Sequence, residues 1–254
     1  MDICVLGRDF NALLRKAQQR DYEFVVSGCD WGGSDYIPAQ HIKISTTVHV
    51  VVGVLPTGKL DILHIQRYSG MNYDDIVNDI MHNHSVRNGF AIASDFGVGA
   101  VYNSKIREKL PPEKHLIFGY VGPASDLISE PKQAHIYNQW SLNKTESLSL
   151  TYEAIRQQRI RCFDWAIAEE FLSDFLNIFR SPGESPSGAT TFIYRAHPSK
   201  PNDTAMAINY AFMLAKILLK EPMFADSSLK SRLEQTFHSG LDYSSASFPG
   251  HISG

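Results

Sequence analysis

Two short apolar runs that each end in an aspartate constrain this chain more than any other feature of its sequence. One spans residues 24–30 and ends at Asp30, and the other spans residues 90–95 and ends at Asp95. A glycine-containing turn follows each of them. Because short apolar runs closed by turn formers are typical of buried strands, the sequence predicts two core strands whose last residues are acidic.

The segment between these two strands supplies further β-structure and a helix. Residues 46–54 and 60–68 are β-rich and are separated by a Pro-Thr-Gly-Lys turn, which predicts a hairpin. Residues 73–86 then carry apolar side chains at helical spacing behind an acidic first turn. We therefore expect an antiparallel meander of three strands followed by a helix.

The segment after the second aspartate continues with alternating helix and strand. A helix is predicted over residues 100–109 and a fifth strand over residues 114–120. Strand–helix–strand units are parallel and right-handed in nearly all folds. The predicted fold class is therefore α/β, with a mixed five-stranded sheet, made of the antiparallel meander and the parallel strands, flanked by helices.

The remaining sequence is less regular. Its pattern predicts helices over residues 148–158, 166–179 and 204–219, an edge strand over residues 161–163 and a loop over residues 181–188. Asp203 is a residue type that favours the N-cap of the last of these helices. We expect a polar helical lead-in or linker (1–22), one main domain (23–221) and a C-terminal tail (222–254).

The composition is that of an ordinary globular chain. Hydrophobic residues make up 43% of the 254 residues and the formal net charge is −3, so any face that binds nucleic acid must be a local patch. The three cysteines are isolated, which argues against a disulfide framework or a zinc site and fits a reducing cytosol. No apolar run approaches the ~20 residues of a membrane span, and the N-terminus lacks a signal peptide pattern. We therefore expect a cytoplasmic protein without a membrane partner.

Three aspartates are the candidate site residues. Asp30 and Asp95 end strands whose carboxyl ends meet at one edge of the sheet, and Asp203 starts a helix that can close onto that edge. Three carboxylates repel one another unless hard cations lie between them, and oxygen-only ligands suit Mg²⁺ or Mn²⁺. The predicted chemistry is two-metal phosphodiester hydrolysis, with all three aspartates as catalytic metal ligands.

The sequence blocks that contain these aspartates resemble a known family. They are Ser27-Gly-Cys-Asp-Trp-Gly-Gly, Ala93-Ser-Asp-Phe-Gly-Val-Gly-Ala and Asn202-Asp-Thr-Ala-Met-Ala-Ile-Asn-Tyr-Ala. In order and spacing they resemble the nuclease domain of tailed-bacteriophage terminase large subunits, in the ribonuclease H-like superfamily, over roughly residues 23–219. The family often has an acidic pair where this chain has Asn202-Asp203, so one carboxylate of the family pattern is missing.

The resemblance implies a metal-dependent endonuclease that cuts concatemeric double-stranded DNA during viral genome packaging. The implied cofactors are Mg²⁺ or Mn²⁺ ions at a two-metal site. The implied partners are double-stranded DNA, an ATPase domain, the small terminase subunit and the portal protein. The implied location is the host-cell cytoplasm.

Other polar residues are weaker candidates. His197 and Asp35 are candidates for residues that contact the metal ligands without binding the metal, although His197 also fits an ordinary structural histidine. Four basic residues could follow the phosphate backbone of DNA, or could equally form a solvated helix face. These are Lys144, Arg156, Arg159 and Arg161.

Other function classes share parts of this pattern. Asp30 and Asp95 with their glycine turns also resemble the phosphate loops of actin-like sugar kinases and ATPases, but this chain is too short for the duplicated domain that those proteins need. Holliday-junction resolvases and transposases also use three acidic residues to bind metal, so they are alternatives within the nucleases. A catalytically inactive DNA-binding module is a further alternative. The stretch 53–60 matches a phosphate-loop pattern, but Leu60 replaces the required Ser or Thr, so we expect a hairpin there.

Overall fold

The computed structural model describes residues 4–5, 22–32, 46–122, 126–129, 139–162, 165–184 and 190–219. Asp35 lies outside these ranges, as do most of the lead-in and the whole predicted C-terminal tail. Among the described helices, none is long and apolar enough to cross a membrane.

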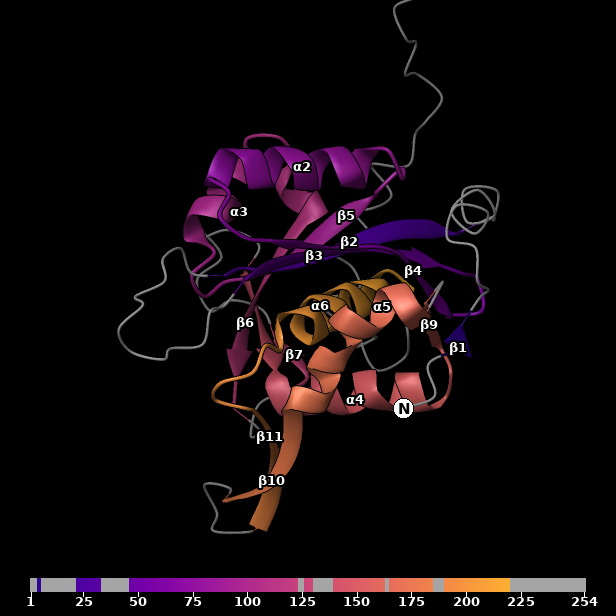
Figure 1. Ribbon diagram of the computed structural model, residues 1–254, viewed down its shortest axis with the longest axis vertical. Helices are drawn as coiled ribbons and strands as arrows, with labels where there is room; N and C mark the ends of the chain where they lie inside the picture. The colour runs from indigo at the N-terminus through magenta and orange to yellow at the C-terminus, as the bar shows by residue number, and fades with distance from the viewer. Residues whose placement is uncertain are drawn as a thin grey trace, which may run out of the picture.

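One mixed sheet forms the centre of the described chain (Figure 1). Its nine strands follow the order β1-β9-β4-β3-β2-β5-β6-β8-β7. The strands are β1 (Cys4–Val5), β2 (Phe24–Asp30), β3 (Thr47–Val54), β4 (Leu60–Tyr68), β5 (Ala91–Asp95), β6 (His115–Val121), β7 (Ile128–Ser129), β8 (Gln139–Asn143) and β9 (Ile160–Cys162). A separate antiparallel hairpin consists of β10 (Ile178–Glu184) and β11 (Thr190–Ala196).

The predicted order of strands is confirmed at the centre of this sheet. β2, β3 and β4 form the antiparallel meander, and β2, β5 and β6 run parallel. The segment 55–59 is a hairpin turn, in which the Gly58 amide donates to the Leu55 carbonyl (2.8 Å). The prediction of five strands is too low, because β8 and β7 extend one side and β9 and β1 the other. Of these, β9 was expected as an edge strand over residues 161–163, and the other three have two to five residues, too few to show an alternating pattern.

Helices cover both faces of the sheet (Figure 1). On one face lie α2 (Tyr73–Ser85) and α3 (Ala100–Arg107); on the other lie α4 (Lys144–Arg156), α5 (Trp165–Leu172) and α6 (Asp203–Leu218). Short 3₁₀ helices, η2 (Pro112–Lys114) and η3 (Ser173–Asn177), complete the elements. Each face has its own apolar core, with Ile80 and Ile106 under α2 and α3, and Leu142 and Phe212 around α6.

Four local expectations are wrong. Cys4–Val5 in the lead-in is a strand that pairs with β9, so β9 is not an edge strand. Residues 181–184 belong to β10 rather than to a loop, because they are paired along β11. The N-cap of α6 is Asn202, and Asp203 is the first residue of the helix. The predicted helix over 166–179 ends at Leu172, after which a 3₁₀ turn leads into β10.

Helix α6 lies against β2 without any side chain between them at Gly28. A Cβ built on Gly28 would lie 2.0 Å from the carbonyl oxygen of Ala207 and 2.8 Å from the amide nitrogen of Ala211. Both are backbone atoms, so relief requires a shift of the whole helix. Small residues on both elements therefore allow α6 to cross the middle of the sheet.

Gly28→Ala is expected to destabilise the protein by about 3 kcal/mol, since forcing extra volume into a packed core typically costs 1–3 kcal/mol. Urea denaturation followed by circular dichroism measures this loss. Gly122→Ala is the matched control, because a Cβ there would meet nothing within 4 Å. Equal midpoints for the two variants would mean that α6 is not seated on Gly28.

Candidate active site

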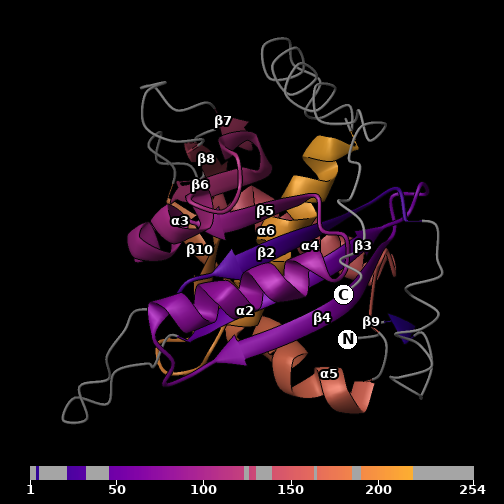
Figure 2. The ribbon, with the colours of Figure 1, turned by 90° about the horizontal axis from the view of Figure 1, so that it is seen from above.

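Asp30 and Asp95 lie at the carboxyl ends of neighbouring parallel strands. β2 and β5 are paired up to Cys29 and Ser94, so each aspartate is the next residue of its strand. In Figure 2 the arrow of β2 ends on the left of the molecule. Neighbouring strands lie about 4.8 Å apart, and side chains alternate between the faces of a sheet. Gly28 faces α6, so Asp30, two residues later, lies on the α6 face as well.

The Tyr210 hydroxyl of α6 places Asp95 on this same face. It donates to Oδ1 of Asp95 over 3.2 Å. Burial, followed by the charges of Tyr120, Asp95 and Asp30, raises the pKa of Tyr210. The pKa of Tyr120 is also raised, mainly by burial and further by Asp30 and Asp95. Both carboxylates thus act on the same two hydroxyls, and neither tyrosine was among the site residues predicted from sequence.

The environment of Asp95 combines desolvation with hydrogen bonds to its charged form. Burial raises the pKa of the Asp95 carboxyl. Hydrogen bonds from the Gly97 backbone and from the Tyr210 hydroxyl oppose this rise, as does the charge of Lys144. A cation close to Asp95 would favour the charged carboxylate in the same way as Lys144 does.

Lys144 reaches this site from the first turn of α4. Asn143 caps this helix by accepting from the backbone N–H of Glu146 (3.1 Å), and β8, which ends at Asn143, is paired with β6. The Nζ of Lys144 lies 5.4 Å from the ring centre of Tyr120. The charge of Lys144 therefore acts on Asp95, at a place where a phosphate could contact the lysine.

Asp203 is held differently from the other two aspartates. Its Oδ2 accepts from the backbone N–H and the hydroxyl of Thr46, each over 3.1 Å. Thr46 immediately precedes β3, so Asp203 joins the start of α6 to the start of that strand. Across the described ranges, no group of three or more His, Cys, Asp or Glu side chains is arranged to hold a metal ion. The structure thus places Asp30 and Asp95 at adjacent strand ends, whereas Asp203 is hydrogen-bonded to Thr46.

Asp174 is a buried acid near Asp203 that the sequence did not reveal. Its Oδ2 accepts from the backbone N–H of Thr204 (2.9 Å) and from Arg67 (3.0 Å). Burial raises the pKa of Asp174, and the charge of Asp203 contributes to the rise. Its position in η3, inside a segment expected to be one long helix, gave no signal of this contact. Asp174 therefore helps to fix the first turn of α6.

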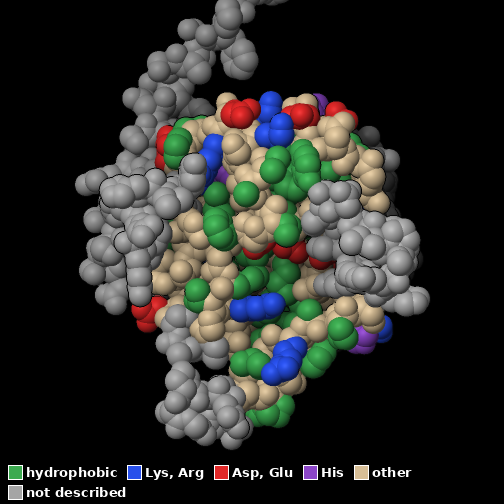
Figure 3. Space-filling model, turned by 90° about the vertical axis from the view of Figure 1, so that its left-hand side faces the viewer, with side chains coloured by type: hydrophobic (Ala, Val, Ile, Leu, Met, Phe, Trp, Pro, Cys, Tyr) green, Lys and Arg blue, Asp and Glu red, His purple; other side chains and the backbone are tan. Residues whose placement is uncertain are grey.

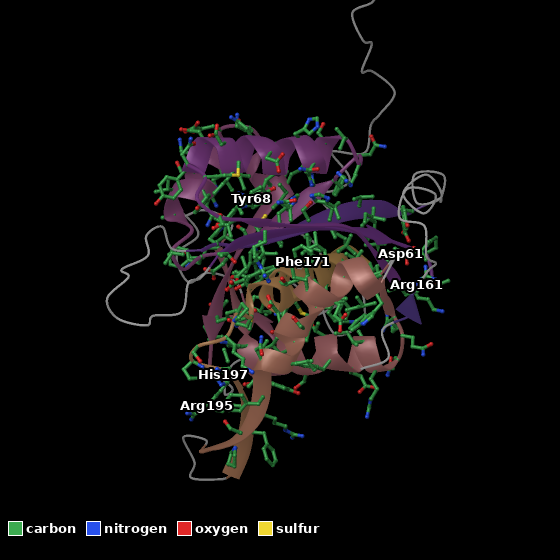
Figure 4. The ribbon with its side chains drawn as sticks, in the orientation of Figure 1. Asp61, Tyr68, Arg161, Phe171, Arg195 and His197 are labelled. Atoms are coloured by element: carbon green, nitrogen blue, oxygen red, sulfur yellow. The ribbon has the colours of Figure 1, made fainter. Side chains whose placement is uncertain are left out.

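Arg159 and Arg161, which follow α4, lie away from the strand ends that bear Asp30 and Asp95. Arg161 Nε donates to the buried Asp61 (2.6 Å), and Asp61 is paired with Gly53, at the far end of β3 from Thr46. Figure 4 shows Arg161 and Asp61 together on the right, whereas β2 ends on the left. Arg159 donates to the Gly58 carbonyl (3.2 Å) in the hairpin turn. Arg156 is exposed and forms an ion pair with Glu153 of its own helix.

His197 follows β11, near the base of the hairpin (Figure 4). Its Nδ1 accepts from the backbone N–H of Ser199 over 3.2 Å, and the backbone N–H of His197 donates to the Asn177 carbonyl over 2.7 Å. These contacts place His197 in the turn that leads to α6. Asp35 cannot be placed, because it lies outside the described residues.

The face that contains the strand ends is hollowed. Figure 3 looks at the side that is on the left in Figure 1, and acidic side chains cross the hollow there. Lys or Arg side chains lie below them in the same view. The surface thus presents a negative strip beside positive charges, an arrangement suited to cations and to a phosphate backbone.

Known structures share this architecture. No protein-family model matches the sequence, and no curated protein matches it. The nuclease domain of the large terminase subunit gp2 of bacterial virus Sf6, as a mutant with manganese and beta-thujaplicinol, is 14% identical, with a TM-score of 0.51 over 78% of this chain and 92% of that chain. A mutant of the same Sf6 subunit with calcium gives a TM-score of 0.50 at 15% identity, over the same shares of each chain. The HK97 bacteriophage large terminase is 9% identical, with a TM-score of 0.46 over 79% of this chain and 42% of that chain.

Proposed function

We propose that this chain, which has the ribonuclease H-like fold of phage terminase nuclease domains, is a metal-dependent endonuclease that hydrolyses double-stranded DNA. The observation that carries the proposal is the pair Asp30 and Asp95, on one face at the ends of neighbouring parallel strands, with the charge of Lys144 acting on Asp95. Open α/β sheets place their sites at this edge. An acid pair with an adjacent lysine suits a negatively charged substrate that arrives with cations.

The donor set of the site fits a hard divalent cation. Asp30 and Asp95 supply carboxylate oxygens, which Mg²⁺ and Mn²⁺ prefer, and burial of Asp95 makes an unpartnered charge costly there. Asp30 and Asp95 would hold the ion, and Asp203 is the third carboxylate of a two-metal site in this proposal. A divalent cation supplies positive charge to a phosphoryl oxygen and makes a water molecule easier to deprotonate.

The chain's own residues have separate tasks in this proposal. Tyr210 orients the Asp95 carboxylate through its hydroxyl. Thr46 holds Asp203 in one orientation through two hydrogen bonds. Lys144 attracts the phosphate backbone and places the scissile group over the two strand ends. The buried face of α6 behind the site excludes water from the rear.

The biological setting is the finer part of the proposal. The Sf6 and HK97 proteins with this fold are described as terminase large subunits or their domains. We propose that this chain likewise cuts concatemeric DNA for viral genome packaging in the host cytoplasm. Its partners would be an ATPase domain, a small terminase subunit and a portal protein.

Incubation of supercoiled plasmid with the protein tests the proposed activity. Nicked and linear products are expected with Mg²⁺ or Mn²⁺, and no cutting is expected when a chelator is added. Gel electrophoresis follows the products. Intact plasmid at every metal concentration would refute the nuclease proposal, whereas cutting in the presence of chelator would refute its dependence on metal.

Lys144→Ala is expected to weaken DNA binding and to reduce the salt dependence of affinity by about one unit of slope, since each lost phosphate contact removes roughly 0.9. Fluorescence anisotropy with a labelled duplex and a chelator measures binding without cleavage. Arg156→Ala is the matched control, because Arg156 is exposed on the same helix and its ion partner lies within that helix. An equal loss in both variants would place the DNA elsewhere.

A further inference from the structure

Asp30 and Asp95 lie side by side at the point where the ladder between β2 and β5 ends. The last registered pair is Cys29 with Ser94, one residue before the two acids. On their other sides, Asp30 is paired with Val48 of β3 and Asp95 with Phe118 of β6. Because two like charges at this spacing repel, a link between the strand ends would help to hold the acids at a fixed distance.

Asn103 of α3 forms such a link on the face of the sheet opposite to the carboxylates. Its Nδ2 donates to the backbone carbonyl of Asp95 over 2.9 Å. Its Oδ1 accepts from Nε1 of Trp31, the residue after Asp30, also over 2.9 Å. The same oxygen accepts from the Ser94 hydroxyl over 2.8 Å. One side-chain amide thereby joins the chain just after one acid to the main chain of the other.

The orientation of this amide follows from its partners. An indole N–H can only donate, and a backbone carbonyl can only accept. The amide oxygen of Asn103 must therefore face Trp31, and its nitrogen must face Asp95. Asn103 is 4% exposed, so water cannot replace either bond without opening the core.

Trp31 is itself fixed, so the link is stiff at both ends. Its ring is stacked on Tyr102 of α3, with ring centres 4.5 Å apart and planes within 1°. A Cβ built on Gly99 would lie 1.9 Å from Cδ1 of Trp31, so the turn after Asp95 fits around the indole only with glycine there. The two turns that follow the acids thus pack against each other and against α3.

We infer that Asn103 is a positioning residue, which sets the spacing of Asp30 and Asp95 and so the affinity of the site for divalent metal. This inference rests on the proposed function, because it concerns the same pair of carboxylates. Asn103 does not touch the carboxylate groups, and it acts through the Asp95 carbonyl and the Trp31 indole. Supporting groups of this kind commonly change metal affinity by 10- to 100-fold.

Two variants separate this role from general stability. Asn103→Leu has a similar volume and removes all three side-chain bonds, whereas Trp31→Phe keeps an aromatic ring for stacking and removes only the indole donor. Tyr22→Phe is the control, because it removes a hydrogen bond to Asp61 (3.0 Å) at the far end of the sheet from the two acids. Calorimetric titration with Mn²⁺ without DNA gives Kd, and plasmid cutting against Mn²⁺ concentration gives a midpoint.

Asn103→Leu is expected to raise both the Mn²⁺ Kd and the cleavage midpoint by about 10-fold or more, with a smaller change in the rate at saturating Mn²⁺. Trp31→Phe should also raise the Mn²⁺ Kd and the cleavage midpoint. The double variant should give the same values as Asn103→Leu, because both substitutions remove the same link between the strand ends. Wild-type values in both single variants, or an equal rise in Tyr22→Phe, would overturn the positioning role. Failure of the wild type to bind Mn²⁺ and to cut DNA would instead overturn the proposed function.

Discussion

Asp95→Asn is expected to reduce metal-dependent DNA cleavage by about 10³-fold or more. A metal site supplies several kcal/mol of transition-state stabilisation, and each 1.36 kcal/mol corresponds to a factor of ten in rate. Asparagine has nearly the same volume and can still accept from Tyr210, so the fold should be preserved. Plasmid cleavage with Mn²⁺ and far-ultraviolet circular dichroism measure the two quantities.

Asp30→Asn and Asp203→Asn should have the same effect if all three carboxylates serve the reaction. Asp75→Asn is the matched control, since Asp75 is exposed on α2, which covers the face of the sheet opposite to the two carboxylates. Full activity of Asp203→Asn alone would show that two acids suffice and that Asp203 only joins α6 to Thr46. Full activity of Asp95→Asn would exclude this edge of the sheet as the active site.

Acidification from about pH 6.5 to pH 4 is expected to destabilise the protein by several kcal/mol, because histidines of α2, β3 and β4 are held in the neutral form in the folded state. Burial, the largest cause, lowers the pKa of both His64 and His84 from 6.5 to about 4, and that of His49 well below 6.5. The unfolded chain therefore binds protons more readily than the folded chain. The stabilising effect is complete above pH 6.5 and is lost as the pH falls through about 4. The difference between 6.5 and about 4 corresponds to about 3 kcal/mol for each of His64 and His84.

The midpoint of urea denaturation at a series of pH values measures this loss. His84 is 2% exposed and shares a 2.7 Å hydrogen bond with Ser27. His84→Gln should make the pH profile flatter, whereas His82→Gln, an exposed position on the same helix, should leave it unchanged. An identical pH profile for wild type and His84→Gln would refute this assignment.

The sequence was most informative where a local pattern determines position. Asp30 and Asp95 could be placed as neighbours because each ends a short apolar strand, and parallel strands bring such ends together. Tyr210 was open to the same reasoning, since it lies seven positions after Asp203, two helical turns along α6. The role of Asp30 and Asp95 as metal ligands stays a prediction.

Long-range partners could not be read from local patterns. Arg161 has the composition of a solvated or DNA-binding residue, and only the pairing of β4 with β9 shows that it meets Asp61. Pro182 and Gly183 are residue types that favour a turn, yet their backbone is paired with β11. The residues next to them in sequence do not predict this partner. Asn103 likewise sits on an unremarkable helix, and its role depends on two turns that are distant in sequence from each other.

The alternation of side chains in β2 and β5 makes the site depend on the number of residues more than on their identity. Gly28 and Asp30 face α6, whereas Cys29, between them, faces α2 and α3. Deletion of a single residue within β2 would turn its carboxylate to the wrong face, while substitutions at most strand positions would leave its direction intact. The site therefore requires a fixed number of residues in each strand more strictly than it requires particular residues along the strand.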